Sequence, residues 1–114
     1  MGMSETQVSF QEIVERAIQY LKTADFQGAK EQLQLAFALD MNAPQVHNLI
    51  GIMFELKHEE SLAMRHYRAA ATLDGTYRPA LENLYRLGTS DRKRKAIDYG
   101  SGYESLTQRV NSNR

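Results

Sequence analysis

Apolar residues recur at steps of three and four along most of the chain, from Phe10 to about Leu87. This spacing places them on one face of successive α-helices. Four sets carry the pattern: Phe10, Ile13, Val14, Ala17, Ile18, Tyr20 and Leu21; Ala29, Leu33, Ala36 and Phe37; Val46, Leu49, Ile50, Met53 and Phe54; and Leu62, Ala63, Tyr67, Ala70 and Leu73. No stretch of the sequence shows the two-residue alternation typical of half-buried strands. The pattern therefore predicts an all-α fold.

Short breaks separate the predicted helices, at residues 23–25, 40–42, 57–58 and 74–76. Pro44 and Pro79 stand where new helices would begin, because the first turn of a helix tolerates a residue without an N–H. Gly88 follows the last periodic residue, where a helix commonly ends. Connections this short predict that consecutive helices pack antiparallel.

The sequence also repeats itself at an offset of 34 residues. Six positions are identical at this offset, against about two expected by chance for an ordinary composition. The identical pairs are Gln11/Gln45, Ile18/Ile52, Ala29/Ala63, Ala36/Ala70, Leu39/Leu73 and Asp40/Asp74. A helix–turn–helix unit with a 34-residue period is typical of one class of repeat protein.

The repeat resembles the tetratricopeptide repeat family over roughly Phe10 to Gly88. That family has a small residue midway along the first helix, an aromatic residue three positions later, and two alanines seven apart in the second helix. The matching residues are Ala17, Tyr20, Ala29 and Ala36 in the first unit and Gly51, Phe54, Ala63 and Ala70 in the second, with Tyr67 between the alanines. The usual proline at the end of each unit is replaced by Met41 and Gly75. The resemblance implies a short right-handed α-solenoid of antiparallel helix pairs, with repeat one at 10–43, repeat two at 44–77 and a cap helix at 78–88.

Both ends of the chain differ from this repeat region. Residues 1–8 are expected to form a flexible N-terminus, and residues 89–114 a basic extension that is partly helical or disordered. The extension contains six basic and three acidic residues, a charge of +3. Short helices are expected from Ser90 or Asp91 to about Tyr99 and from Tyr103 to Val110. Helices of this length are marginal in water without docking, and Ile97 and Tyr99 are among the apolar residues that would dock them.

Net charge, cysteine content and the length of apolar runs exclude several classes of protein. The 114 residues include 14 basic and 14 acidic side chains, and a net charge of zero argues against nucleic acid or an anionic membrane as the main partner. The absence of cysteine excludes disulfides and thiolate chemistry and favours a reducing compartment. No apolar run approaches the ~20 residues of a membrane span, and no secretory signal is visible. We therefore expect one cytoplasmic domain with no membrane span.

Candidate catalytic chemistry is sparse in this sequence. His47, His58 and His66 are the only histidines, and the helix that follows His58 lacks the second histidine that a zinc-binding helix needs. No glycine-rich loop precedes a helix to hold a phosphate, and no serine is framed as an activated nucleophile beside a base. We therefore expect no enzyme, no metal site and no cofactor.

The family resemblance implies a concave groove, lined by the first helix of each pair, that binds a peptide or helix of a partner protein. By register, the groove residues are Gln11, Val14, Glu15, Ile18, Leu21, Gln45, Asn48, Leu49, Ile52, Glu55, Glu82, Asn83 and Arg86. Their apolar members are expected to form an exposed strip edged by amides and carboxylates, and such strips usually mark a partner site. The expected function is a non-catalytic adaptor, scaffold or co-chaperone-like module for a partner whose identity the sequence does not specify.

Three alternatives remain open from the sequence. The apolar strip can join two copies of the chain in a homodimer, or the C-terminal extension can cover it. Arg92, Lys93, Arg94 and Lys95 can contact nucleic acid or an anionic membrane. A groove that grips a C-terminal carboxylate is disfavoured, because Arg86 is its single basic candidate.

Overall fold

The computed structural model describes residues 8–89 and 95–100, and within these ranges it contains five helices and no strand. The helices are α1 (Phe10–Lys22), α2 (Phe26–Leu39), α3 (Pro44–Leu56), α4 (Glu60–Leu73) and α5 (Arg78–Leu87). The all-α class predicted from the apolar spacing is confirmed. None of the helices in the described ranges is long and apolar enough to cross a bilayer.

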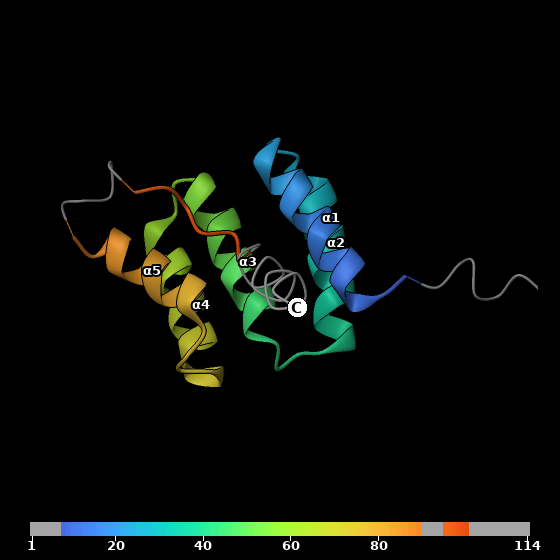
Figure 1. Cartoon of the computed structure of the whole chain (residues 1–114). Helices are drawn as coiled ribbons and strands as arrows, with labels where there is room; N and C mark the ends of the chain where they lie inside the picture. Colours follow the sequence, from blue (N-terminus) through green and yellow to red (C-terminus); the bar gives the residue numbers. More distant parts are fainter. Residues whose placement is uncertain (1–7, 90–94, 101–114) are drawn as a thin grey trace, which may run out of the picture.

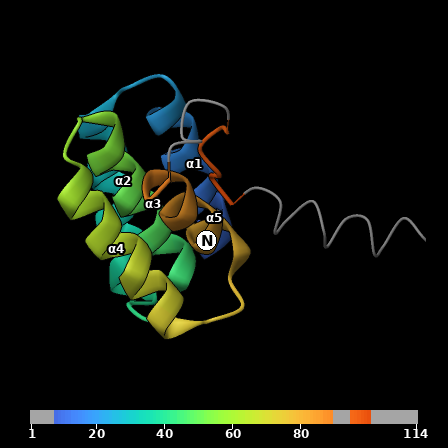
Figure 2. The ribbon, with the colours of Figure 1, turned by 90° about the vertical axis from the view of Figure 1, so that its left-hand side faces the viewer.

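Consecutive helices pack against each other (Figure 1). The most extensive contacts join α1 to α2 and α3 to α4, so the chain is organised as two helix pairs followed by α5. α3 also contacts both α1 and α5, which makes it the central helix of a face formed by α1, α3 and α5. Figure 2, turned by 90°, shows the same three helices grouped on one side of the molecule.

The helix starts follow from local side-chain chemistry. Ser9 caps α1 because its hydroxyl accepts a hydrogen bond from the Glu12 N–H at 3.0 Å, and the Glu12 carboxylate accepts one from the Ser9 N–H at 3.0 Å. Asp25 caps α2 by accepting the Gly28 N–H at 3.0 Å. Such caps satisfy N–H groups that have no partner inside the helix. Pro44 and Pro79 lie in the first turns of α3 and α5, as their positions in the sequence predict.

The helix bounds repeat with the period of the sequence. α3 and α4 begin and end 34 residues after α1 and α2, respectively. Ala24 and His58, also 34 residues apart, lie in the turns within the two pairs and have positive φ angles of 60° and 65°. Positive φ is uncommon for alanine and histidine. Its occurrence at matching positions shows that both turns close in the same way.

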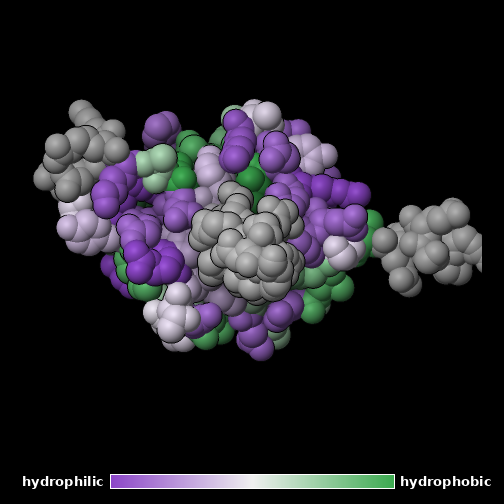
Figure 3. Space-filling model, in the orientation of Figure 1, coloured by the Kyte–Doolittle hydropathy of each residue, from purple (hydrophilic) through white to green (hydrophobic). Residues whose placement is uncertain are grey.

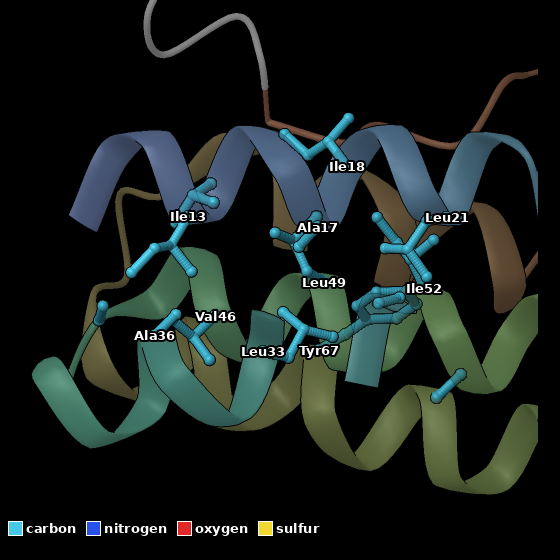
Figure 4. Packing of buried hydrophobic residues seen from close by; sticks show 14 of the residues in the cluster. Ile13, Ala17, Ile18, Leu21, Leu33, Ala36, Val46, Leu49, Ile52 and Tyr67 are labelled. Carbon is cyan, nitrogen blue, oxygen red and sulfur yellow. The ribbon is translucent and has the colours of Figure 1, made fainter. Parts of the chain in front are cut away.

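The core lies between the helix pairs. In Figure 4, the Ala17 and Leu21 side chains of α1 point toward Leu49 and Ile52 of α3. Tyr67 of α4 is fully buried, and a Cβ added to Gly51 of α3 would lie 2.7 Å from its ring. The absence of a side chain at this position lets α3 and α4 approach closely.

The C-terminal extension differs from its predicted form. A short helix reaching Tyr99 was expected, but residues 95–100 form no helix. The helix is lost because the backbone of this segment is hydrogen-bonded to side chains of α3 and α5 instead, as described below. The predicted helix from Tyr103 to Val110 and the expected flexibility of residues 1–7 concern residues outside the described ranges.

Candidate functional site

The predicted groove residues lie on the face formed by α1, α3 and α5, but most of them are buried. Eight are buried and five are half-buried; the buried ones are Val14, Ile18, Leu21, Asn48, Leu49, Ile52, Asn83 and Arg86. Ile18 and Ile52, expected at the centre of an exposed strip, are only 2% and 0% exposed. The prediction of an exposed apolar strip is therefore wrong. α1 packs directly on α3, and a further segment of the chain covers the remaining surface.

Residues 95–100, called here the groove segment, are that cover. They pass across α3 in Figure 1 and lie next to α1 and α5 in Figure 2. Ile97 and Tyr99 pack against the core, whereas Lys95 and Ala96 are exposed. Ile97 and Tyr99, two residues apart, therefore both lie against the helices. The alternative in which the C-terminal extension covers the strip is observed for this segment.

Two buried asparagines hold the backbone of the groove segment. The Asn83 Oδ1 accepts the Asp98 N–H at 2.9 Å, and the Asn83 Nδ2 donates to the Asp98 carbonyl at 2.9 Å. The Asn48 Nδ2 donates to the same carbonyl at 3.1 Å. Both asparagine side chains are fully buried. We call this pair the amide clamp; it satisfies both polar backbone groups of one extended residue, which buried groups require.

A network of polar side chains formed by Arg86, Glu55 and Tyr67 orients the clamp residue Asn83. The Arg86 guanidinium donates to both Glu55 carboxylate oxygens, at 2.6 and 2.8 Å, and to the Asn83 Oδ1 at 3.1 Å. The Tyr67 hydroxyl donates to Glu55 at 2.7 Å. On its far side, the Asn83 Nδ2 donates to the Asn48 Oδ1 at 2.9 Å. Asn83 is thus held from both sides, with its acceptor oxygen and its donor nitrogen in fixed places.

The electrostatics of this network follow from burial and pairing. Hydrogen bonding to Glu55 raises the pKa of the Arg86 guanidinium. Burial, followed by the hydrogen bond to Glu55, raises the pKa of the Tyr67 phenol far above its ordinary value. Arg86 therefore stays charged and Tyr67 stays neutral. Because Arg86 is 4% exposed and bound to Glu55, it is not free to grip a carboxylate of another molecule.

The end of the groove segment is fitted closely. The Asp98 carboxylate accepts the Gly100 N–H at 3.0 Å, which closes a tight turn, and Gly100 has a positive φ of 86°. A Cβ at Gly100 would lie 2.5 Å from the hydroxyl of Tyr77. The Lys22 ammonium lies 5.3 Å from the centroid of the Tyr99 ring, within cation–π range. Asp98, Tyr99 and Gly100 therefore each make a contact that depends on the type of residue at that position.

A second depression, of about 390 Å³, lies between α2, α3 and α4. It is lined by Leu33, Phe37, Ile50 and Met53 and by two histidines, His47 and His66, whose Nδ1 atoms are 3.5 Å apart. Burial lowers the pKa of His66, with further lowering by His47 and Arg65. Among the described residues, no group of three or more metal-binding side chains occurs. The visible face in Figure 3 is dominated by hydrophilic side chains over its described part.

The predicted basic cluster lies largely outside the described ranges. Arg92, Lys93 and Arg94 are not described, whereas Lys95 is exposed, with its ammonium 5.9 Å from the Tyr85 ring centroid. Lys95 begins the groove segment and so stands at the edge of the α1, α3 and α5 face.

Sequence reasoning placed the clamp asparagines together with Glu55 and Arg86 on the groove face, but it missed other residues of the site. Tyr67 was assigned only to helix packing, and Tyr77, Asp98 and Gly100 were not assigned to the site. The apolar pair Ile97 and Tyr99, two residues apart beside a glycine, was the available signal for a docked extended segment. Comparison with protein-family models, with curated proteins and with solved structures gives no match for this chain.

Proposed function

We propose that this chain is a non-catalytic protein-interaction module that binds an extended segment of a partner protein at the amide clamp. The observation that carries the proposal is the two-point hydrogen bonding of Asn83 to the Asp98 backbone, reinforced by Asn48. A side-chain amide that pairs with both the N–H and the C=O of a residue recognises main chain. Main-chain recognition gives affinity for any extended peptide, and flanking side-chain pockets give specificity.

The repeat architecture supports this proposal. The 34-residue offset between helix pairs and the matched turns at Ala24 and His58 fit an array of tetratricopeptide-like units. Stacked helical repeats present one continuous face to a ligand. In this chain that face is formed by α1, α3 and α5, and it carries the amide clamp on an apolar floor.

The partner segment is bound along its length rather than by its terminus. Arg86, which contacts the clamp through Asn83, is paired with Glu55 and is only 4% exposed, so it is not available to receive a terminal carboxylate. The alternative, a same-face homodimer, would need the same displacement of residues 95–100, because the apolar side chains of the strip are buried. Recognition of internal, extended segments is therefore the use that fits this surface.

A peptide-selection experiment tests the proposal. A random peptide library is selected on the full chain carrying Ile97→Ser, which weakens the contact of residues 95–100 with the core. Each selected peptide is then measured against the same chain with Asn48→Ala, Asn83→Ala or the control Asn42→Ala added. Asn42 lies in an exposed loop, so its loss should not change binding. We expect binding to weaken about tenfold or more in the two clamp variants, since hydrogen bonds to buried backbone groups are lost. Peptides that bind all folded variants equally would refute the proposal.

A further inference from the structure

The groove segment makes the contacts that a bound partner peptide would make. Its main chain occupies the amide clamp at Asp98, its apolar side chains Ile97 and Tyr99 lie on the core, and its Gly100 N–H is bound by the Asp98 carboxylate. Residues 97–100 are half-buried, so they are partly open to solvent. The contact is therefore short, and it leaves its residues partly exposed, unlike the fully buried core between the helix pairs.

The specificity of this contact can be derived position by position. Asn48 and Asn83 contact only main-chain atoms of residue 98, so they do not select a side chain. The side chain at that position instead closes the turn by accepting the Gly100 N–H, a bond that aspartate and asparagine form well. The neighbouring positions hold an aliphatic residue and an aromatic residue against the core.

The last position of the contact disfavours any side chain. Gly100 combines a positive φ of 86° with an approach that would place a Cβ 2.5 Å from the Tyr77 hydroxyl. Either feature alone disfavours other residues, and together they leave glycine as the one residue that fits without movement. Tyr77 is 7% exposed and precedes α5, so its ring is held by the fold.

We propose that residues 95–100 are a built-in competitor for the groove and that the partner segment has the same pattern: an aliphatic residue, Asp or Asn, an aromatic residue, and glycine. This inference rests on the proposed function and adds to it the sequence class of the partner and the control of access. The occupant it commits to is a segment of another protein, which displaces residues 95–100 when it binds.

The tether sets how strongly the groove segment competes. Only five residues, 90–94, separate it from Thr89 after α5. A short tether gives an effective concentration in the millimolar range. A partner peptide therefore binds weakly unless its own contacts are stronger than those of residues 95–100 or its local concentration is comparable. Its apparent Kd rises as the fraction of molecules with residues 95–100 out of the clamp falls.

The test uses the full chain and a labelled synthetic peptide with the sequence of residues 95–100, followed by fluorescence anisotropy. Gly100→Val is designed to release the groove segment in cis, and Ile97→Ser is a second releasing variant in case the first fails to fold. Ala96→Ser is the matched control, because Ala96 is exposed beside the same contacts. We expect the peptide to bind the releasing variants about tenfold or more tightly than the wild type or the control.

Specificity is tested with two further measurements. Adding Asn83→Ala to a releasing variant should remove the gain, and a peptide with valine in place of its final glycine should not bind. Equal affinity for wild type and both releasing variants, or equal binding of the valine peptide, would overturn the inference. If that happened while library peptides still required Asn48 and Asn83, the proposed function would stand and only the competitor and its pattern would fall.

Discussion

The buried ion pair between Glu55 and Arg86 gives a direct test of how the site is supported. Arg86 is 4% exposed, and its guanidinium makes two hydrogen bonds to the Glu55 carboxylate. Replacing Glu55 with alanine leaves a buried charge without its counter-ion and removes the acceptor of the Tyr67 hydroxyl. Breaking such a pair costs about 3–5 kcal/mol. Because domains of this size are typically stable by only about 5–15 kcal/mol, a large part of the folding free energy should be lost.

Urea unfolding followed by circular dichroism measures this loss. The matched control is Glu82→Ala, which removes the exposed ion pair with Arg78, where the two side chains are 39% and 77% exposed. Exposed pairs of this kind contribute about 0–1 kcal/mol. We also expect the double variant Glu55→Leu/Arg86→Met to be more stable than Glu55→Leu alone, because removing both charges leaves neither unpaired.

The same experiment examines the clamp. Arg86 donates to the Asn83 Oδ1, so loss of Glu55 should also loosen Asn83 and speed hydrogen exchange at the Asp98 amide. Equal destabilisation by Glu55→Ala and Glu82→Ala would refute the description of Glu55 and Arg86 as a buried ion pair. A normal exchange rate at Asp98 in a destabilised Glu55→Ala variant would show that the network supports the fold but does not position the clamp.

Three further predictions concern the core and its titration. Gly51→Ala should destabilise by about 1–3 kcal/mol in urea unfolding, since its Cβ would lie 2.7 Å from the buried Tyr67 ring, whereas Gly75→Ala, whose Cβ would be 3.8 Å from the nearest atom, should change little. The fold lowers the pKa of His66 below 6.5, so at pH values just below 6.5 the unfolded chain binds more protons than the folded chain. The free energy of unfolding should therefore fall as the pH drops through 6.5 toward the folded pKa. His66→Gln should remove this fall from unfolding curves measured over a series of pH values, and exposed His58→Asn should not. Ile18→Asp should destabilise by more than about 3 kcal/mol in urea, because it places a charge at a position only 2% exposed; near-native stability would contradict its place in the core.

The helical fold was predictable because each local signal agreed with the others. Apolar spacing, the two prolines and the polar breaks mark the same helix limits, and the 34-residue offset in sequence reappears in the helix bounds. Such agreement between local and overall preferences is typical of sequences with one stable fold. The bounds of α1 and α3 follow directly from these features.

The site was predictable only in part. Asn48 and Asn83 could be placed on the right face by helical register, since register depends on local spacing. The Glu55–Arg86 ion pair joins residues 31 apart, and their spacing along the chain does not predict the contact. Burial of Ile18 and Ile52 was missed because an amphipathic helix looks the same whether its apolar edge faces solvent or another segment.

The helical form expected for residues up to Tyr99 was the clearest error of sequence reasoning, and its cause is physical. Residues up to Tyr99 can form a short helix, but such helices are weak in isolation. Three hydrogen bonds between buried asparagines and the Asp98 backbone, two donated by the amides and one accepted by Asn83, outweigh that preference. Tertiary contacts of this kind cannot be inferred from the residues of the segment alone.

Displacement of the groove segment tests the central claim most directly. A library-selected peptide is titrated into the ¹⁵N-labelled full chain while the Asp98 amide and the side-chain amides of Asn48 and Asn83 are followed by NMR. We predict that the Asp98 amide loses its protection from hydrogen exchange as the peptide saturates, while the Asn83 side-chain amide remains hydrogen-bonded, now to the peptide. Saturation of the peptide with the Asp98 amide still protected would place binding on another face and contradict the account.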